Sequence, residues 1–329
     1  CALIAGKLRD FGYKSRSWLG WQLPILTTGN HSSSRIVKIY KNKILNYLKK
    51  GGIPIITGFQ GINNDFRITT LERGGSDTSA ILCAKFFNAE KCIIFTDVKG
   101  VYTTDPNLIK NAKKIEKISY EEMLEMASLG AKVMQPASIQ EARLNRIEID
   151  VRSTFSKMSG TLITKKKDIL GKNTIRGISF TKNDAKLTLI GVKDKPGIAA
   201  SIFKPLYENS INVDMVVQNV SAGGRETDLT FTIKLEDLKK TRRLVENNKY
   251  IKFRKLIVNK NVSKVSIVGV GMVTTPGITY RMFRALAKKK INIEVISTSE
   301  IKISVLIDKK NLKKSVEILH QEFKLSNSL

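Results

Sequence analysis

The sequence predicts an α/β domain followed by two smaller α+β modules. In the first half, short β-branched runs at 51–59 and 91–98 enclose an apolar helical segment at 77–89. Strand, helix and strand in this order favour a parallel sheet with helices on its faces. In the second half the chain repeats itself, which indicates a tandem pair of similar modules.

The remaining elements of the first half follow the same alternation. Residues 118–134 carry apolar side chains at helical spacing, and Ser119 with Glu122 three residues later predicts a capping box. A strand is expected at 147–155, before residues 156–164. The charged, glycine-containing stretch 165–173 is interpreted as a linker and domain boundary.

The repeat covers residues 186–221 and 264–300. Pro196 aligns with Pro276 and Ile211 with Ile291, each pair 80 residues apart. Both copies read as a strand, a Pro-Gly loop opening a helix, and a second strand that begins Ile-Asn. A further β-like run and a helix follow each copy. The order β-α-β-β-α is typical of a ferredoxin-like sandwich, and two copies are too few for a solenoid.

Composition narrows the function classes. The chain has 329 residues, of which 42% are apolar and 26% charged, as in soluble globular proteins. The net charge of +28 comes from lysines scattered among glutamates, without an aromatic-interleaved basic stripe. We therefore expect a solvated cationic surface and no nucleic-acid or membrane partner. The odd count of three cysteines, without metal-ligand spacing, predicts reduced thiols in a cytoplasmic protein.

The stretch TTLERGGSDTSA, residues 69–80, is the first candidate for chemistry. Arg73 offers a planar fork that grips a carboxylate in bidentate fashion. Gly74 and Gly75 leave backbone N–H groups open to an anion, and Ser76 and Asp77 stand at the start of a helix. The pattern suits a small anionic substrate beside a phosphate. The alternative is a capped turn that only starts the helix.

Together with this stretch, FTDVKGVYTTDPN, EEMLEMASLGAKVM, DKPGIAA…INVDMVVQNVS and TPGIT…INIEVISTSE resemble the aspartate kinases. The resemblance covers essentially the whole chain, with long motifs in the right order. It implies an amino-acid-kinase (carbamate-kinase-like) parallel-sheet sandwich followed by two ACT modules. The expected boundaries are 1–164 for the kinase portion, 165–173 for the linker, and 174–250 and 251–329 for the ACT modules, whose strands can interleave.

One part of the family pattern has no counterpart here. The Lys-Phe-Gly-Gly motif and a later Gly-Glu pair of the family are absent, and the chain begins with Cys1. The first residues resemble the helix that follows that pair. The sequence is therefore interpreted as an aspartate kinase without its first strand and part of its active site.

The resemblance also implies roles for the substrate-site residues. It assigns Arg73 to the α-carboxylate of L-aspartate, with Phe59, Gly74, Gly75 and Ser76 in the same site. It assigns Asp77 to organising the catalytic lysine and the metal. The expected catalytic residues are Asp77 and Arg73, and no set of protein metal ligands is assigned.

A nucleotide site is implied next to it. A Thr-Asp at a strand end before a glycine-containing loop suits a crevice at the carboxyl edge of a parallel sheet. The implied nucleotide residues are Thr96, Asp97, Tyr102, Thr103, Thr104, Asp105, Pro106, Asn107, Lys132 and Val133. The family often has arginine where Asn107 stands. The alternative for this loop is a plain β-turn, and Walker-type P-loops are absent from the sequence.

The repeats imply regulation by amino acids, with lysine and/or threonine as effectors. In the first, the loop would receive a carboxylate through backbone N–H groups, and Asp214 would suit an ammonium. The implied residues are Asp194, Lys195, Pro196, Gly197, Ile198, Ala199, Asn212, Val213, Asp214 and Gln218, then Ile278, Thr279, Asn292, Ile293, Ser299 and Glu300. The alternative is that the modules serve only to join a homo-oligomer, which paired ACT modules favour.

The implied reaction is phosphoryl transfer from ATP with Mg²⁺ to the side-chain carboxylate of aspartate, at the head of lysine, threonine and methionine synthesis. Positioning and charge neutralisation dominate such catalysis, and an ionised carboxylate needs no general base. His31 and His320 accordingly lie outside every motif and are expected on the surface. Three rival classes stay open: another amino acid kinase, a non-catalytic regulatory subunit, and a nucleic-acid binder.

Overall fold

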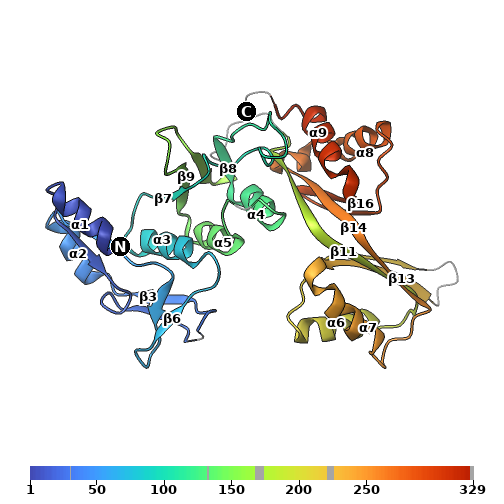
Figure 1. Cartoon of the computed structure of the whole chain (residues 1–329), viewed down its shortest axis with the longest axis horizontal. Helices are drawn as coiled ribbons and strands as arrows, with labels where there is room; N and C mark the ends of the chain where they lie inside the picture. Colours follow the sequence, from blue (N-terminus) through green and yellow to red (C-terminus); the bar gives the residue numbers. More distant parts are fainter. Residues whose placement is uncertain (30, 132, 167–173, 221–225, 327–329) are drawn as a thin grey trace. The chain divides into compact units, whose positions relative to one another are not determined.

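The computed structural model describes residues 1–29, 31–131, 133–166, 174–220 and 226–326 (Figure 1). By its internal contacts the chain forms two compact units. Unit 1 comprises Cys1–Thr103 and Lys113–Lys172, and unit 2 comprises Thr104–Ala112 and Asn173–Ser328. Each is described below by itself. Lys132 and residues 167–173 of the expected linker lie outside the described residues.

Unit 1 is an α/β unit with several small sheets. Its helices are α1 (Ala2–Asp10), α2 (Asn42–Lys49), α3 (Gly75–Phe86), α4 (Tyr120–Ser128) and α5 (Pro136–Asn145). Its strands are β1 (Ser15–Trp18), β2 (Ile25–Thr27), β3 (Ile36–Ile39), β4 (Ile53–Ile56), β5 (Gln60–Ile62), β6 (Ile68–Thr70), β7 (Lys91–Thr96), β8 (Lys117–Ser119), β9 (Glu148–Ser153) and β10 (Thr161–Thr164).

Parallel pairs occur in unit 1, but β4 and β7, the two runs expected to share one parallel sheet, lie in separate sheets. β1 and β4 form a parallel pair, and β7 is parallel to β9 in the order β7-β9-β10-β8. A third sheet has the order β3-β2-β5-β6. The predicted capping box is confirmed, because the Ser119 hydroxyl accepts from the Glu122 amide at 3.1 Å and the Glu122 carboxylate accepts from the Ser119 amide at 3.2 Å.

Unit 2 contains the repeated modules. Its helices are α6 (Ile198–Glu208), α7 (Leu238–Glu246), α8 (Ile278–Lys288) and α9 (Leu312–Glu322), with short 3₁₀ turns at Leu235–Asp237, Val270–Thr274 and Lys309–Asn311. Its strands are β11 (Gly177–Lys193), β12 (Val213–Val220), β13 (Glu226–Lys234), β14 (Lys255–Val268), β15 (Val295–Ser299) and β16 (Lys302–Asp308). They form one six-stranded sheet in the order β12-β13-β11-β14-β16-β15.

The two modules share their longest strands, β11 and β14 (Figure 1). Residues 184–193 of β11 pair with β13 of the first module, whereas residues 177–181 pair with residues 264–268 of β14, which also pair with β16. The first module therefore uses the second half of β11, which begins in the second module. The second module likewise uses the second half of β14, which begins in the first. Separate hydrophobic cores form around α6 and α7 and around α8 and α9, with Phe231 and Met282 fully buried at their respective centres.

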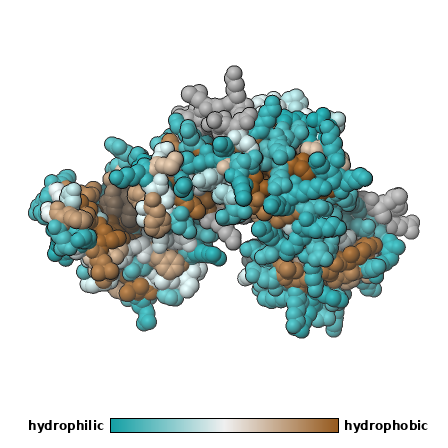
Figure 2. All heavy atoms as spheres, turned by 45° about the horizontal axis from the view of Figure 1, so that its top comes forward, coloured by the Kyte–Doolittle hydropathy of each residue, from teal (hydrophilic) through white to brown (hydrophobic). Residues whose placement is uncertain are grey.

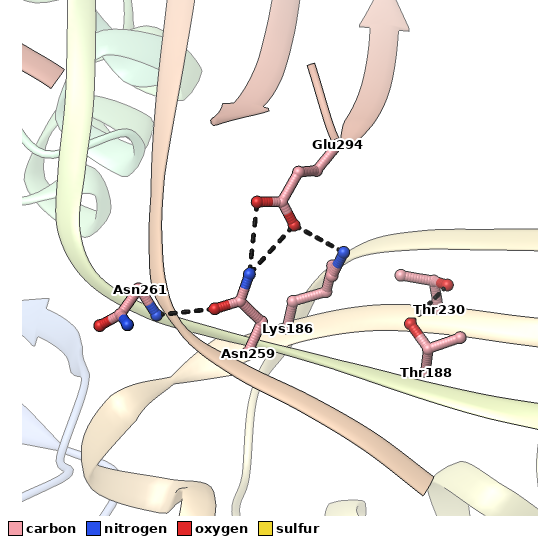
Figure 3. Close-up of polar contacts among 6 residues, drawn as sticks. All are labelled: Lys186, Thr188, Thr230, Asn259, Asn261 and Glu294. Carbon is pink, nitrogen blue, oxygen red and sulfur yellow. Dashed lines mark hydrogen bonds and ion pairs between the residues drawn. The ribbon is translucent and has the colours of Figure 1, made fainter. Parts of the chain in front are cut away.

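Polar groups join the modules along the antiparallel pairing of β11 and β14, the stretch where the chain passes from one module to the other and which is called the crossing below (Figure 3). Lys186 forms an ion pair with Glu294 at 2.6 Å, and the Asn259 amide donates to both oxygens of the Glu294 carboxylate at 3.3 and 3.2 Å. Lys264 forms an ion pair with Asp214. Because Lys186 heads the first repeat and Lys264 the second, each lysine binds the carboxylate of the other module.

Residues Thr104–Ala112 pack with unit 2, although they fall inside the range 1–164 expected for the kinase portion. Ile109 is buried in the core around α8 and α9, and the Asn111 amide donates to the Ser326 hydroxyl at 2.8 Å. At the base of this segment, the Thr103 amide donates to the Lys113 carbonyl at 2.8 Å. The sequence shows that residue 109 is an apolar isoleucine, but it does not identify the element against which that side chain packs.

The histidines and the surface complete the description. His31 is exposed as expected, but the expectation for His320 is wrong: it is fully buried in α9, where its ring bonds to the Ser326 hydroxyl at 3.2 Å.

Hydrophilic residues cover most of the face in Figure 2, with hydrophobic residues in separate patches. Among the described residues, no helix has the length and apolar character that a bilayer crossing requires.

Candidate active site and effector pocket

The residues of the Arg-Gly-Gly-Ser-Asp motif form the turn that opens α3. Gly74 is the N-cap with φ of 81°, a left-handed conformation that glycine adopts without strain. A side chain on Gly75 would begin 2.6 Å from the Leu71 Cβ and 2.9 Å from the Phe59 ring. Glycine therefore suits the backbone conformation at position 74 and the close packing at position 75, and the Gly75 amide donates to the Glu72 carbonyl at 2.9 Å.

Phe59 adopts an unusual backbone conformation beside this turn. Its φ is 66°, which is rare for a bulky residue and is typical of constrained sites. The Phe59 amide donates to the Ser79 hydroxyl at 3.0 Å, and its carbonyl accepts from the Leu71 amide at 3.1 Å. Both backbone polar groups are thus held from elements outside its own loop.

A pocket of about 590 Å³ brings the predicted substrate residues together. It is lined by Ser32, Phe59, Thr70, Leu71, Arg73, Gly74, Gly75 and Ser76. Arg73 is exposed, and its guanidinium has no hydrogen-bond or ion-pair partner within the described parts of the chain. An arginine held at a pocket without a protein partner is available for an anionic ligand.

Asp77 follows in the first turn of α3. Burial raises the pKa of its carboxyl above the usual value, since a half-buried carboxylate loses hydration. The negative charge of Asp77 in turn contributes, after burial, to raising the pKa of the Cys92 thiol to about 11. Burial raises the pKa of Cys83 to about 12, so neither thiol is a nucleophile at neutral pH.

The predicted nucleotide residues lie in two segments. Thr96 ends β7, and its hydroxyl donates to the Asp97 carboxylate at 3.0 Å. Tyr102 and Thr103 follow in unit 1, whereas Thr104, Asp105, Pro106 and Asn107 belong to the segment that packs with unit 2. Val133 is half-buried, and Lys132 lies outside the described residues.

Two details distinguish the second of these segments. The Asp105 carboxylate accepts from the Asn107 amide at 2.8 Å, so it closes a turn, as the β-turn alternative expects. The buried Thr104 hydroxyl has no partner among the described residues. A buried hydroxyl of this kind normally finds a hydrogen bond, and a ligand can supply it.

A second pocket, of about 380 Å³, lies in the first ACT module. It is lined by Asp194, Lys195, Pro196, Gly197, Ile198, Ala199 and Gln218. Gly197 is the N-cap of α6, so the first backbone N–H groups of that helix begin at the pocket wall. The loop and Gln218 of β12 are therefore brought together as the sequence pattern expects.

The other predicted effector residues occupy equivalent places in the two modules. Asn212 directly precedes β12 and Val213 begins it, whereas Asn292 and Ile293 precede β15. Ile278 and Thr279 begin α8, whose N-cap Gly277 has φ of 85°, close to the 86° of Gly197. Ser299 ends β15, with Glu300 in the turn after it. Asp214 does not line this pocket, and its carboxylate forms an ion pair with Lys264.

Comparison with known proteins agrees with this architecture. A model of the amino acid kinase family matches residues 1–153, and a model of the ACT domain matches residues 187–248 and 265–323. Over 326 residues the chain is 44% identical to an aspartate kinase of Pseudomonas fluorescens strain SBW25, covering 98% of this chain and 79% of that protein. The chain belongs to the aspartate kinase family. Aspartokinase 2 of Bacillus subtilis strain 168 is 40% identical over 326 residues, with 99% and 79% covered.

Solved structures of aspartate kinases resemble this one. Escherichia coli aspartokinase III, crystallised with aspartate and ADP in the R-state, superposes with a TM-score of 0.79 at 26% identity, covering 98% of this chain and 72% of that chain. The Clostridium acetobutylicum enzyme shares the fold, with a TM-score of 0.83 at 23% identity. The predicted fold, an amino acid kinase domain followed by ACT modules, is confirmed, and the chain is an aspartate kinase enzyme.

One residue of this aspartate kinase escaped the sequence analysis. Ser79 lies within the stretch 69–80 but was assigned no role; it does not line the pocket at the start of α3, yet its hydroxyl holds the backbone of Phe59. A serine in an apolar helical run carries no signal of a tertiary partner, since such side chains commonly bond to their own helix.

Proposed function

We propose that the pocket at the start of α3 binds L-aspartate and that the enzyme transfers the γ-phosphoryl group of ATP to its side-chain carboxylate. The single observation that carries this proposal is Arg73, exposed at the pocket and without a protein partner among the described residues. Its guanidinium would bind the α-carboxylate in bidentate fashion, with Phe59 and Ser76 in the same pocket. The similar E. coli enzyme was crystallised with aspartate and ADP, which supports both ligands.

Asp77 and the loop after β7 would serve the nucleotide. The carboxylates of Asp77 and Asp97 are hard oxygen donors that fit Mg²⁺, which usually takes one or two carboxylates plus phosphate oxygens. Among the described residues, no group of three or more histidine, cysteine, aspartate or glutamate side chains is placed to hold a metal ion. Bound Mg²⁺ would neutralise charge on the phosphates. The aspartate side chain is already ionised at neutral pH, so the reaction needs no general base.

The ACT modules would make this activity responsive to lysine and/or threonine, and so place it at the head of lysine, threonine and methionine synthesis. The pocket of the first module supports this, because it combines helix N–H groups for a carboxylate with the side chain of Asp194 for an ammonium. E. coli aspartokinase III was also crystallised with lysine and aspartate in the T-state.

Homo-oligomer formation through the ACT modules is part of the same proposal. β12 and β15 are the two outer strands of the six-stranded sheet. Each carries an exposed aliphatic side chain at an equivalent position of the repeat, Val216 at 48% and Ile296 at 43% exposure. Apolar groups repeated on outer strands suit a symmetric interface.

The substrate assignment is tested by Arg73→Ala in the full-length protein. Loss of one charged bidentate contact should raise the KM for aspartate about 10- to 100-fold and leave the KM for ATP within about twofold. Arg67→Ala removes an exposed arginine that does not line the pocket and is the matched control. An unchanged aspartate KM for Arg73→Ala contradicts the assignment.

The regulatory assignment is tested by calorimetric titration with lysine, threonine and both together. Saturable binding that Gln218→Ala weakens supports an effector site in the first module. Synergy between the two amino acids would indicate concerted feedback. Absence of binding by a folded protein would leave the modules with a structural role and would contradict effector regulation.

A further inference from the structure

The Ser79 side chain links two parts of the proposed aspartate site. Ser79 lies in the second turn of α3 and is 4% exposed. Its hydroxyl donates to the Gly75 carbonyl at 2.7 Å and accepts from the Phe59 amide at 3.0 Å. The first bond is an ordinary contact within the helix, whereas the second reaches a loop 20 residues away.

Phe59 depends on such a contact because its backbone is strained. A left-handed conformation is rare in a bulky residue and persists only where the surroundings fix it. The bond from the Leu71 amide holds the Phe59 carbonyl, and the bond to Ser79 holds the Phe59 N–H. Without the hydroxyl, the N–H would lack its partner and the loop could relax.

Close packing explains why Ser79 can reach this loop. A side chain added to Gly58 would begin 3.4 Å from the Ser76 Cα and 3.6 Å from the Ser79 Cβ. The chain therefore passes directly beside the start of α3. The Phe59 ring lies against Gly75 on the same side, and both residues line the pocket.

We propose that Ser79 is a positioning residue for aspartate, which it does not touch. Ser79 fixes the Phe59 backbone against the first turn of α3. It thereby sets the distance across the pocket between Phe59 and the turn formed by residues 73–76. This inference rests on the proposed substrate site. Small displacements of such walls reduce the fit of a small substrate, since orientation depends on fixed geometry.

The test compares Ser79→Ala, Ser79→Thr and Ser315→Ala in the full-length protein. Ser79→Ala should raise the KM for aspartate about 10-fold, the equivalent of one lost hydrogen bond, with the KM for ATP within about twofold. Ser79→Thr retains the hydroxyl and should stay near the parent values. Ser315→Ala is the control, because the buried Ser315 hydroxyl makes the same helix bond, to Asn311 at 2.9 Å, in α9.

Three outcomes overturn the inference: an unchanged aspartate KM in Ser79→Ala, an equal rise in both KM values, or a Ser79→Thr variant as impaired as Ser79→Ala. Where Ser79→Ala gives no folded protein, Ser79→Cys supplies a weaker partner of similar size and decides by the same two KM values. The Arg73→Ala variant distinguishes failure of the positioning role from failure of the proposed substrate site. If it raises the aspartate KM while Ser79→Ala does not, only the positioning role fails; if it has no effect, the proposed substrate site fails.

Discussion

The two ion pairs that cross between the ACT modules are related by the repeat but differ in their surroundings. Lys186 and Glu294 are both largely buried, at 19% and 18% exposure, and Asn259 also binds the Glu294 carboxylate (Figure 3). In the other pair, Lys264 is 6% exposed but Asp214 is 52% exposed. The same pairing is therefore closed from solvent at one end of the crossing and open at the other.

The difference has a visible origin at the centre of the crossing. Thr181 pairs with Lys264, and Asn259 pairs with Lys186, so the register is symmetric about the pair Asp184 and Val262. At that central pair the symmetry breaks, because one strand has a carboxylate and the other an isopropyl group. Lys264 consequently has a second carboxylate near it, that of Asp184, whereas the ion pair that Lys186 forms within the described part of the chain is with Glu294.

This comparison also changes the expected role of Asp214. The resemblance implied that its carboxylate receives an effector ammonium, but the carboxylate is bound to Lys264 of the second module. Asp194 lines the pocket of the first module and, in the proposed effector site, is the acidic side chain available to an ammonium group. A repeated Ile-Asn-hydrophobic-acid pattern therefore encodes a contact between the modules.

The largest effect is expected from breaking the buried pair on one side only. Lys186→Met would leave the Glu294 carboxylate buried without its counter-charge and should lower the free energy of unfolding by about 3–5 kcal/mol. The double variant Lys186→Met with Glu294→Leu should recover most of that loss, because an apolar pair of similar volume needs no hydration. Urea unfolding monitored by circular dichroism measures both.

Lys193→Met is the control for this experiment, since Lys193 is exposed on the same strand, β11. It should change the free energy of unfolding by less than about 0.5 kcal/mol. A double variant as unstable as Lys186→Met would show that side-chain shape, and not the burial of an unpaired charge, determines the loss of unfolding free energy.

A smaller effect is expected at the open pair. Asp214→Asn should lower the free energy of unfolding by about 1 kcal/mol, because the carboxylate is half-exposed and Asp184 remains near Lys264. Glu294→Gln should cost more in the same assay, since among the described residues Lys186 forms an ion pair with no other carboxylate. Equal losses for the two variants would contradict the inferred asymmetry.

Much of the fold and of the candidate site followed from local patterns. The repeat, the capping box at Ser119 and the glycine turn before α3 are short-range features that sequence spacing records. The crossed ion pairs, the burial of His320 and the contact of Ser79 with Phe59 are long-range. Periodicity shows that a side chain faces inward, but it does not identify the distant element that faces it. Strand exchange between β11 and β14 was open to sequence reasoning only as a possibility, because either half-strand pattern suits both modules.

The smallest and most specific test concerns Asp184, the charged member of the central pair. Burial is the largest cause that raises the pKa of its carboxyl, while Thr181 and Lys264 oppose the rise and Asp214 adds to it. Because the folded state then holds this proton to higher pH than the unfolded state, the contribution of Asp184 to stability is present at low pH and is lost as pH rises through the raised pKa. Asp184→Asn removes that titration. The unfolding free energy of the parent minus that of the variant should therefore fall as pH rises from about 3.5 to 7, and urea unfolding at several pH values measures it. A difference that rises with pH would show that Lys264 outweighs burial, and that the second carboxylate strengthens the open end of the crossing.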